Sequence, residues 1–165
     1  MPSAYCVIYA SNTSGTLVLV ATKTNQVPNN PGQLVFPGGR IDVAETAKVA
    51  AAREFREETG IAIDLQHNTI SATKTGVAIT AWEVGDFQGY SALYIRVASL
   101  DDLNKVVADA KINIKNGTVQ DRELASVEVM TRRQAHATFF SENNPQDPKK
   151  GTDWFVNISN SKILA

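Results

Sequence analysis

Three glutamates, Glu54, Glu57 and Glu58, stand together near the end of an alanine-rich run at residues 46–59. This run contains no proline or glycine and is dominated by Ala, Glu and Arg, which are strong helix formers. Gly60 suits the left-handed residue that follows a helix. At 100° per residue, positions i, i+3 and i+4 share one arc, so the sequence predicts a helix that presents the three carboxylates together.

Like charges on one arc repel one another, and the helix macrodipole opposes negative charge near the C-terminus. A hard divalent cation among the oxygens removes this cost, and carboxylates are ligands that suit Mg²⁺ or Mn²⁺. Arg53 lies one turn before Glu57 and can hold that carboxylate in place. A solvated acidic helix is the simpler interpretation of the three glutamates alone. The glutamates by themselves therefore do not separate a metal site from a solvated surface.

The other faces of this helix predict its surroundings. Ala47 and Ala50 continue the arc of the glutamates and leave room for a ligand. An apolar stripe on another face is expected to pack on a sheet; it consists of Ala44, Ala51, Ala52 and Phe55. The turn Phe36-Pro37-Gly38-Gly39 precedes the helix, and its glycines permit close backbone approach.

Residues 39–61 follow the pattern Gly-x5-Glu-x7-Arg-Glu-U-x-Glu-Glu-x-Gly-U, in which U is apolar. The fixed positions are Gly39, Glu45, Arg53, Glu54, Glu57, Glu58 and Gly60. Seven fixed identities recur by chance at a given start roughly once in 10^8. The pattern is the signature of the Nudix hydrolases, and the chain resembles that family. The arrangement of strands extends the resemblance, more loosely, over about residues 3 to 140.

The resemblance implies a pyrophosphohydrolase that uses Mg²⁺, with Mn²⁺ as an alternative, and that cleaves a nucleoside diphosphate linked to a moiety X. It implies metal ligands from the carboxylates of Glu54, Glu57 and Glu58 and from a main-chain carbonyl at the turn, at Gly39. Divalent ions would screen the diphosphate oxygens and acidify a water that attacks phosphorus in line. Arg53 belongs to the expected catalytic set with Glu54 and Glu57.

A further catalytic carboxylate is expected in the loop before the final strand, where many Nudix hydrolases carry a glutamate that acts as metal ligand or general base. Glu123 is assigned to that role, with Asp121 and Glu128 as rivals. The general base is a carboxylate that takes a proton from the attacking water. Glu54 and Glu123 are both candidates for it, and the sequence does not separate them.

Lys23 and Arg40 are assigned to substrate binding. Lys23 opens a loop at residues 23–33, a region that helps to line the substrate cleft in Nudix proteins. Its ammonium group therefore either meets a phosphate or stays a solvated surface charge. Three aromatic side chains near a predicted turn either stack on a base or belong to the core and its rim: Trp82, Phe87 and Tyr90.

The leading prediction for the substrate is a nucleoside triphosphate or related nucleotide, and the alternative is ADP-ribose or a nucleotide sugar. Some ADP-ribose-cleaving members carry a proline about fifteen residues after the motif, and some dinucleoside polyphosphate hydrolases carry a tyrosine there. Gly76 and Val77 occupy that region, so neither marker is present. A third alternative is a nucleotide-sensing Nudix module without turnover. Such domains commonly lose motif carboxylates, whereas this chain keeps them.

The chain has 16 basic and 17 acidic residues, a balance that implies no general attraction to nucleic acid or to a membrane. No apolar run approaches membrane-spanning length. The N-terminus lacks the charged and apolar segments of a secretion signal, so a cytoplasmic enzyme is expected. The single cysteine, Cys6, lies in an apolar run and is predicted to be a buried thiol rather than a nucleophile.

The predicted fold is α/β, a Nudix-type α/β/α sandwich with a mixed β-sheet, with the motif helix on one side and a helix capped by Thr131 on the other. One domain is expected over 1–165, with an insertion at about 99–116 whose helix ends near Ala110, and a C-terminal tail at about 141–165. The apolar tail is expected to dock on the domain or on a second subunit, as in a homodimer. The predicted extended segments are 4–10, 17–22, 61–65, 70–75, 77–84, 92–98 and 127–130.

Overall fold

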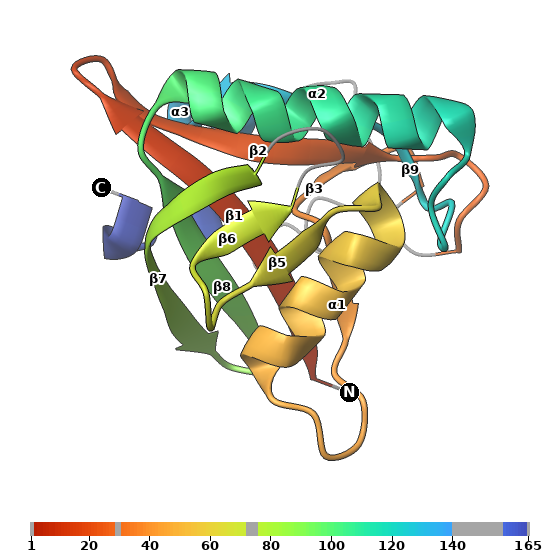
Figure 1. Ribbon diagram of the computed structural model, residues 1–165. Helices are drawn as coiled ribbons and strands as arrows, with labels where there is room; N and C mark the ends of the chain where they lie inside the picture. Colours follow the sequence, from red (N-terminus) through yellow and green to blue (C-terminus); the bar gives the residue numbers. More distant parts are fainter. Residues whose placement is uncertain (1, 29–30, 72–75, 140–156, 165) are drawn as a thin grey trace.

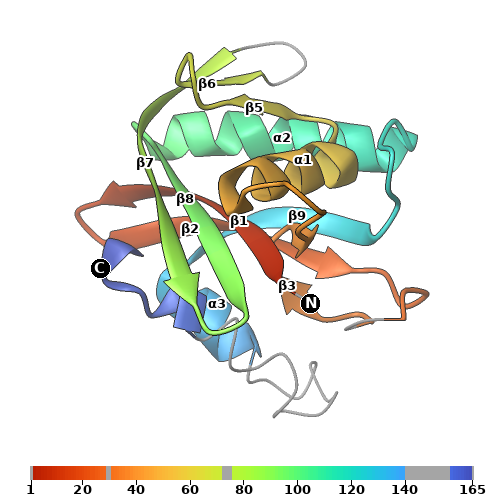
Figure 2. The same ribbon diagram turned by 90° about the horizontal axis from the view of Figure 1, so that it is seen from below.

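A mixed β-sheet separates two helical layers in the computed structural model, which describes residues 2–28, 31–71, 76–139 and 157–164 (Figure 2). Helices α1 (Ala47–Thr59) and α2 (Leu100–Asn116) cover one face. Helix α3 (Arg132–Phe139) and a 3-10 turn, η1 (Lys162–Leu164), lie on the other face. The predicted α/β/α sandwich is confirmed, with the motif helix and the helix after Thr131 on opposite sides.

The sheet is mixed because β1 and β8 run parallel while every other described strand pair is antiparallel. The strand order is β3-β2-β1-β8-β7-β6-β5, and β4 pairs with β1 and β9 with β2 (Figure 1). The strand bounds are β1 Ser3–Asn12, β2 Gly15–Lys23, β3 Leu34–Val35, β4 Gly38–Arg40, β5 Ala62–Asp64, β6 Thr69–Ser71, β7 Gly76–Phe87, β8 Tyr90–Val97 and β9 Leu124–Thr131.

Strand β1 lies in the middle of the sheet and is buried from both faces, which explains its nearly continuous apolar sequence. Alternate side chains pack in the core under α1 and α2, and these are Ala4, Cys6, Ile8 and Ala10. The intervening Val7 and Tyr9 belong to the core on the α3 side. Burial raises the pKa of the Cys6 thiol above its ordinary value, so the thiol stays protonated, in agreement with the predicted inert cysteine.

Helix α1 begins and ends where its sequence predicts. The Thr46 hydroxyl accepts a hydrogen bond from the Val49 N–H at 3.4 Å. At the other end Gly60 adopts φ 75°, and its N–H donates to the Arg56 carbonyl at 2.8 Å. These caps satisfy backbone groups that the helix leaves unpaired at both ends.

The alanines of this region differ in part from the prediction. Ala51 and Phe55 are fully buried against the sheet, as the apolar stripe predicts. Ala44 is not part of that stripe, because it precedes the helix, is exposed and adopts φ 64° in the loop after β4. Ala50 is also fully buried, so the expected space for a ligand beside it is filled by the core.

Helix α2 continues to Asn116, beyond the predicted end near Ala110, because residues on its inner face keep packing into the core. Those buried residues are Leu103, Val106, Val107, Asp109, Ala110 and Asn113. The Ser99 hydroxyl caps its start by accepting from the Asp102 N–H at 3.2 Å, and Gly117 ends it with φ 68°. Within the described residues, no helix is long and apolar enough to cross a membrane.

The C-terminal segment at 157–164 packs on the sheet face that α3 also covers. Ile158 and Leu164 are almost fully buried there. The Tyr94 hydroxyl donates to the Ile158 carbonyl at 2.9 Å, and the Thr16 hydroxyl donates to the Leu164 carbonyl at 2.5 Å. This part of the tail therefore docks on the domain itself. The other apolar tail residues, Trp154 and Phe155, and the predicted extended residues 72–75 lie outside the described residues.

Replacement of Ile158 by alanine should lower the free energy of unfolding by about 2–5 kcal/mol, because it removes a buried aliphatic side chain from a packed face. Urea denaturation followed by circular dichroism measures the change. The matched control is Asn160→Ala, which alters an exposed position of the same segment and should leave stability nearly unchanged. Equal stabilities of the two variants would show that the segment does not pack on the sheet.

Candidate metal and catalytic site

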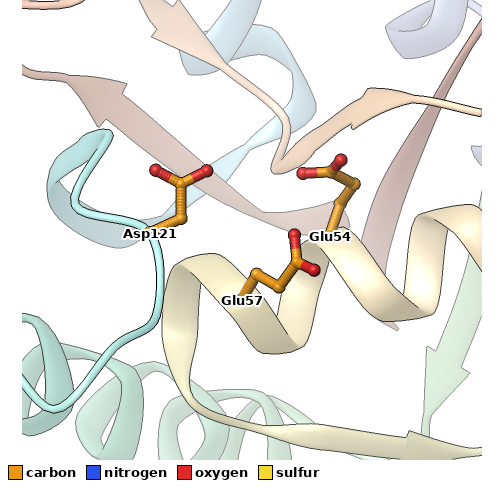
Figure 3. Close-up of side chains that lie close together, drawn as sticks. All are labelled: Glu54, Glu57 and Asp121. Carbon is orange, nitrogen blue, oxygen red and sulfur yellow. The ribbon is translucent and has the colours of Figure 1, made fainter.

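Helix α1 and the loop before β9 bring three carboxylates together (Figure 3). Glu54 and Glu57 come from the helix and Asp121 comes from the loop, and one oxygen from each lies within 4.8 Å of the others. The Asp121 N–H donates to the Glu57 carbonyl at 2.9 Å, which ties the loop to the last turns of α1. Two segments far apart in the sequence thus offer a set of oxygen ligands of the kind that Mg²⁺ and Mn²⁺ prefer.

Glu58 is buried beside the β4 turn, with only 1% of its surface exposed. Its Oε1 accepts from the Gly38 N–H at 2.9 Å, whereas Oε2 has no hydrogen-bond partner among the described residues. Burial raises the pKa of Glu58 well above its ordinary value, and the charges of Glu54 and Glu123 add to this, against the lowering effect of Gly38 and Lys23. A buried carboxylate oxygen without a partner is costly, and a cation at this position would satisfy it.

Gly38 and Gly39 of β4 each have other atoms close to the position that a Cβ would occupy. A Cβ on Gly39 would lie 2.6 Å from the carboxylate carbon and Oε1 of Glu54. A Cβ on Gly38 would collide with the Ala4 carbonyl and would lie 2.6 Å from the Tyr5 ring. Glycine is therefore needed here for close approach, and at Gly39 it makes the room in which the Glu54 carboxylate sits.

The Arg53 guanidinium donates hydrogen bonds to Glu45, Glu54 and Glu57. Its Nε and Nη2 donate to the two oxygens of Glu45 at 2.8 and 3.0 Å, and Nη2 also donates to the Arg40 carbonyl at 2.9 Å. Its Nη1 donates to one oxygen of Glu54 at 3.0 Å and to one of Glu57 at 3.2 Å. Arg53 thus orients two carboxylates of the cluster, and the hydrogen bonds from Arg53 lower the pKa of Glu45.

Burial outweighs the nearby positive charge at two of the cluster carboxylates, Glu54 and Asp121. Burial raises the pKa of Glu54 despite the hydrogen bond from Arg53. Burial also raises the pKa of Asp121, and the charges of Glu123 and Glu57 raise it further. These groups therefore hold protons more tightly than isolated carboxyls do, as expected for carboxyls that are partly buried close to one another.

Lys23 and Glu123 form an ion pair with 3.8 Å between Nζ and Oε2. Only 14% of the Lys23 side chain is exposed, and its charge lowers the pKa of Glu58 and of Asp121, so it faces the carboxylates rather than bulk solvent. Asp121, a rival of Glu123 in the sequence, joins the cluster, whereas Glu123 is held by Lys23. The other rival, Glu128, lies exposed on β9.

Arg40 ends β4 with an exposed side chain at the edge of this region. The sequence-predicted aromatic group is divided between the two faces of the sheet. Phe87 and Tyr90 stack with ring centroids 5.0 Å apart on the α3 side, where Tyr5 meets the Tyr90 ring edge-on at 6.4 Å. Trp82 lies half-buried on the opposite face, where it packs against the core that α1 and α2 cover. The three rings therefore do not form one surface.

Replacement of Gly39 by alanine should raise the Kd for Mn²⁺ about tenfold or more, because the added Cβ displaces the Glu54 carboxylate. Isothermal titration calorimetry measures the affinity. Gly76→Ala is the matched control, since a Cβ there approaches no atom of the described residues closer than 3.7 Å, and its Mn²⁺ affinity should equal that of the unaltered protein. Unchanged affinity in both variants would remove Glu54 from the set of ligands.

Without divalent ions, the free energy of unfolding should fall as pH rises above 4.5, the ordinary value for Glu58, toward its raised folded-state pKa. The folded protein binds the Glu58 proton more tightly than the unfolded chain does, so deprotonation penalises the folded state. Urea denaturation from about pH 5 to about pH 8 measures the slope. Glu58→Gln should make the slope shallower, and an identical slope would contradict the burial of an unneutralised carboxyl.

Comparisons with known proteins agree with this geometry. The NUDIX domain family model matches residues 1–155. A Nudix hydrolase from M. smegmatis, RenU, is similar in structure at 16% sequence identity, with a TM-score of 0.51 over 87% of this chain and 78% of that chain. DR0079 from Deinococcus radiodurans is similar at 16% identity, with a TM-score of 0.50 over 82% of this chain and 70% of that chain.

No curated protein matches the chain significantly. The two solved structures show a shared fold, while the family model covers nearly the whole chain and includes the complete pattern at residues 39–61. The chain therefore belongs to the Nudix family and is a hydrolase acting on pyrophosphate bonds.

Proposed function

We propose that the chain is a Mg²⁺-dependent pyrophosphohydrolase whose substrate is a nucleoside triphosphate or a related nucleotide. The observation that carries this proposal is the meeting of Glu54, Glu57 and Asp121 near Glu58, whose buried Oε2 has no hydrogen-bond partner among the described residues. A diphosphate resists hydrolysis because its negative charge repels nucleophiles. The donor set fits a hard divalent ion, and such an ion would bind both these oxygens and those of a diphosphate.

The four carboxylates would hold the ion, and a main-chain carbonyl at Gly39 is a further proposed ligand. Bound there, a divalent ion supplies charge neutralisation for the diphosphate and a lowered pKa for a water. The protein holds the donor oxygens in place through three contacts: Arg53 on Glu54 and Glu57, the Gly38 N–H on Glu58, and the Asp121 N–H on the α1 backbone.

Glu54 is the proposed general base. Arg53 and the bare Gly39 backbone fix the position of its carboxylate, so one of its oxygens can face a water beside the ion. Glu123 remains the second candidate for this role. Its ion pair with Lys23 indicates a different role, in which Glu123 holds the lysine side chain in place.

Lys23 and Arg40 are proposed to bind phosphate oxygens of the substrate. The Lys23 ammonium lies among carboxylates that a divalent ion would neutralise, and the arriving anionic diphosphate would then become its stronger partner. Arg40 presents an exposed side chain from β4, and Arg53 holds its backbone carbonyl. Both side chains would bind an anionic diphosphate more tightly than an uncharged ligand.

The absence of two sequence markers weakens the rival substrates and so supports the nucleotide preference: Gly76 and Val77 stand where some ADP-ribose-cleaving and dinucleoside polyphosphate-cleaving members carry proline or tyrosine. ADP-ribose or a nucleotide sugar is the alternative substrate. A sensing module without turnover is disfavoured by the complete set of glutamates. A cytoplasmic location and a homodimer remain predictions from the sequence.

Incubation with Mg²⁺ and a panel of a nucleoside triphosphate, a dinucleoside polyphosphate, ADP-ribose and a nucleotide sugar should give phosphorylated products, most rapidly from the triphosphate. Glu57→Gln should reduce the rate about 100-fold or more, because it weakens a metal ligand. Chromatography of the nucleotide products measures both rates.

Glu128→Gln is the matched control, because it makes the same chemical change on the exposed side of β9 and should leave the rate unchanged. Equal product from the unaltered protein and Glu57→Gln would reject metal catalysis by α1. Faster hydrolysis of ADP-ribose or a nucleotide sugar would keep the reaction class and replace the proposed substrate.

A further inference from the structure

Asn113 occupies a buried position near the C-terminus of α2, where the neighbouring buried residues are mainly apolar. Its amide Nδ2 donates a hydrogen bond to the carbonyl of Thr59, the last residue of α1, at 2.9 Å. The last carbonyls of a helix lack partners within the helix, so this bond satisfies one of them from another element. Asn113 therefore caps the helix that carries the glutamates.

The ends of the two helices approach closely at this point. A Cβ on Gly60 would lie 2.8 Å from the Asn113 amide nitrogen, so only glycine lets the amide reach the end of α1. Gly60 also adopts φ 75°, a conformation that favours glycine. One motif residue thus closes the helix and admits Asn113.

Asn113 also holds the loop that follows α2. Its main-chain carbonyl accepts hydrogen bonds from the Thr118 N–H at 3.0 Å and from the Thr118 hydroxyl at 3.3 Å. Its side chain contributes a further contact, because the same hydroxyl donates to Oδ1 at 3.4 Å. Three residues later the Asp121 N–H donates to the Glu57 carbonyl at 2.9 Å. The loop from α2 to Asp121 is therefore fixed at one end to Asn113 and at the other end to α1.

We propose that Asn113 is a positioning residue of the metal site, acting through Asp121 and the last turn of α1. This inference rests on the proposed function, because it assigns Glu57 and Asp121 as ligands of one cation. The two ligands come from separate elements, and their spacing depends on where the loop and the helix end lie. Asn113 contacts both structures. An apolar side chain at this position would pack in the core but would leave the Thr59 carbonyl unpaired.

Mn²⁺ binding to the full chain, measured by electron paramagnetic resonance of the free ion, tests this inference. Asn113→Ala should raise the Mn²⁺ Kd about tenfold, the usual size of an effect on residues that orient ligands. Asn116→Ala, an exposed asparagine at the end of the same helix, should leave the Kd unchanged. Thr118→Val provides a second variant that weakens the same anchor with a smaller change in the core.

A double-mutant cycle separates positioning from general destabilisation. If Asn113 acts through Asp121, Asn113→Ala should raise the Kd by a clearly smaller factor when Asp121→Asn is already present. Equal factors in the two backgrounds would overturn the inference, as would an unchanged Kd in folded Asn113→Ala or Thr118→Val. If the unaltered protein does not bind Mn²⁺, the proposed function is rejected, and this inference is rejected with it.

Discussion

Negative charge gathered at the C-terminal half of α1 is the constraint on which the other features of the site depend. Six carboxylates lie in this region together with two basic side chains, Arg53 and Lys23. The carboxylates belong to Glu45, Glu54, Glu57, Glu58, Asp121 and Glu123. Arg53 contacts three of them, and Lys23 pairs with Glu123. The pKa of Glu58 nevertheless stays well above its ordinary value. Protein cations orient the cluster but do not neutralise it.

Several structural features make sense as supports for that unneutralised charge. The bare glycines of β4 give room to one carboxylate and donate a hydrogen bond to another. The close contact between α1 and α2 sets the end of the charged helix, and the same contact anchors the loop that carries Asp121. The sheet contributes a rigid base, since α1 buries Ala51 and Phe55 against it. Without a cation, this arrangement concentrates repulsion that packing alone must resist.

The part of the site that local sequence determines was predictable, and the part that tertiary contacts determine was not. Helical periodicity places Glu54, Glu57 and Glu58, and the glycines at 38, 39 and 60 mark where the backbone must turn or approach closely. The choice between Asp121 and Glu123 depends on long-range backbone hydrogen bonds that no local pattern encodes: the Asp121 N–H donates to the Glu57 carbonyl of α1, and the Thr24 N–H donates to the Glu123 carbonyl.

Other differences have similar causes. Trp82 and Phe87 stand five positions apart on β7, and successive side chains of a strand face opposite sides, so the predicted aromatic group is divided between the two faces of the sheet. Ala44 is predicted to belong to the apolar face of the helix, yet it adopts a left-handed conformation in the loop that presents Glu45 to Arg53. The length of α2 follows from core contacts of its last turns rather than from helix propensity.

The central claim is that a divalent cation, rather than the protein, neutralises the glutamates of α1. A crystal structure of the chain grown with Mn²⁺ tests it most directly, because Mn²⁺ gives an anomalous scattering signal that marks its position. The account predicts an anomalous peak among the carboxylates of Glu54, Glu57, Glu58 and Asp121, with Glu58 Oε2 turned toward it. A map without a peak at that place, with all four carboxylates bound only to protein side chains, would contradict it.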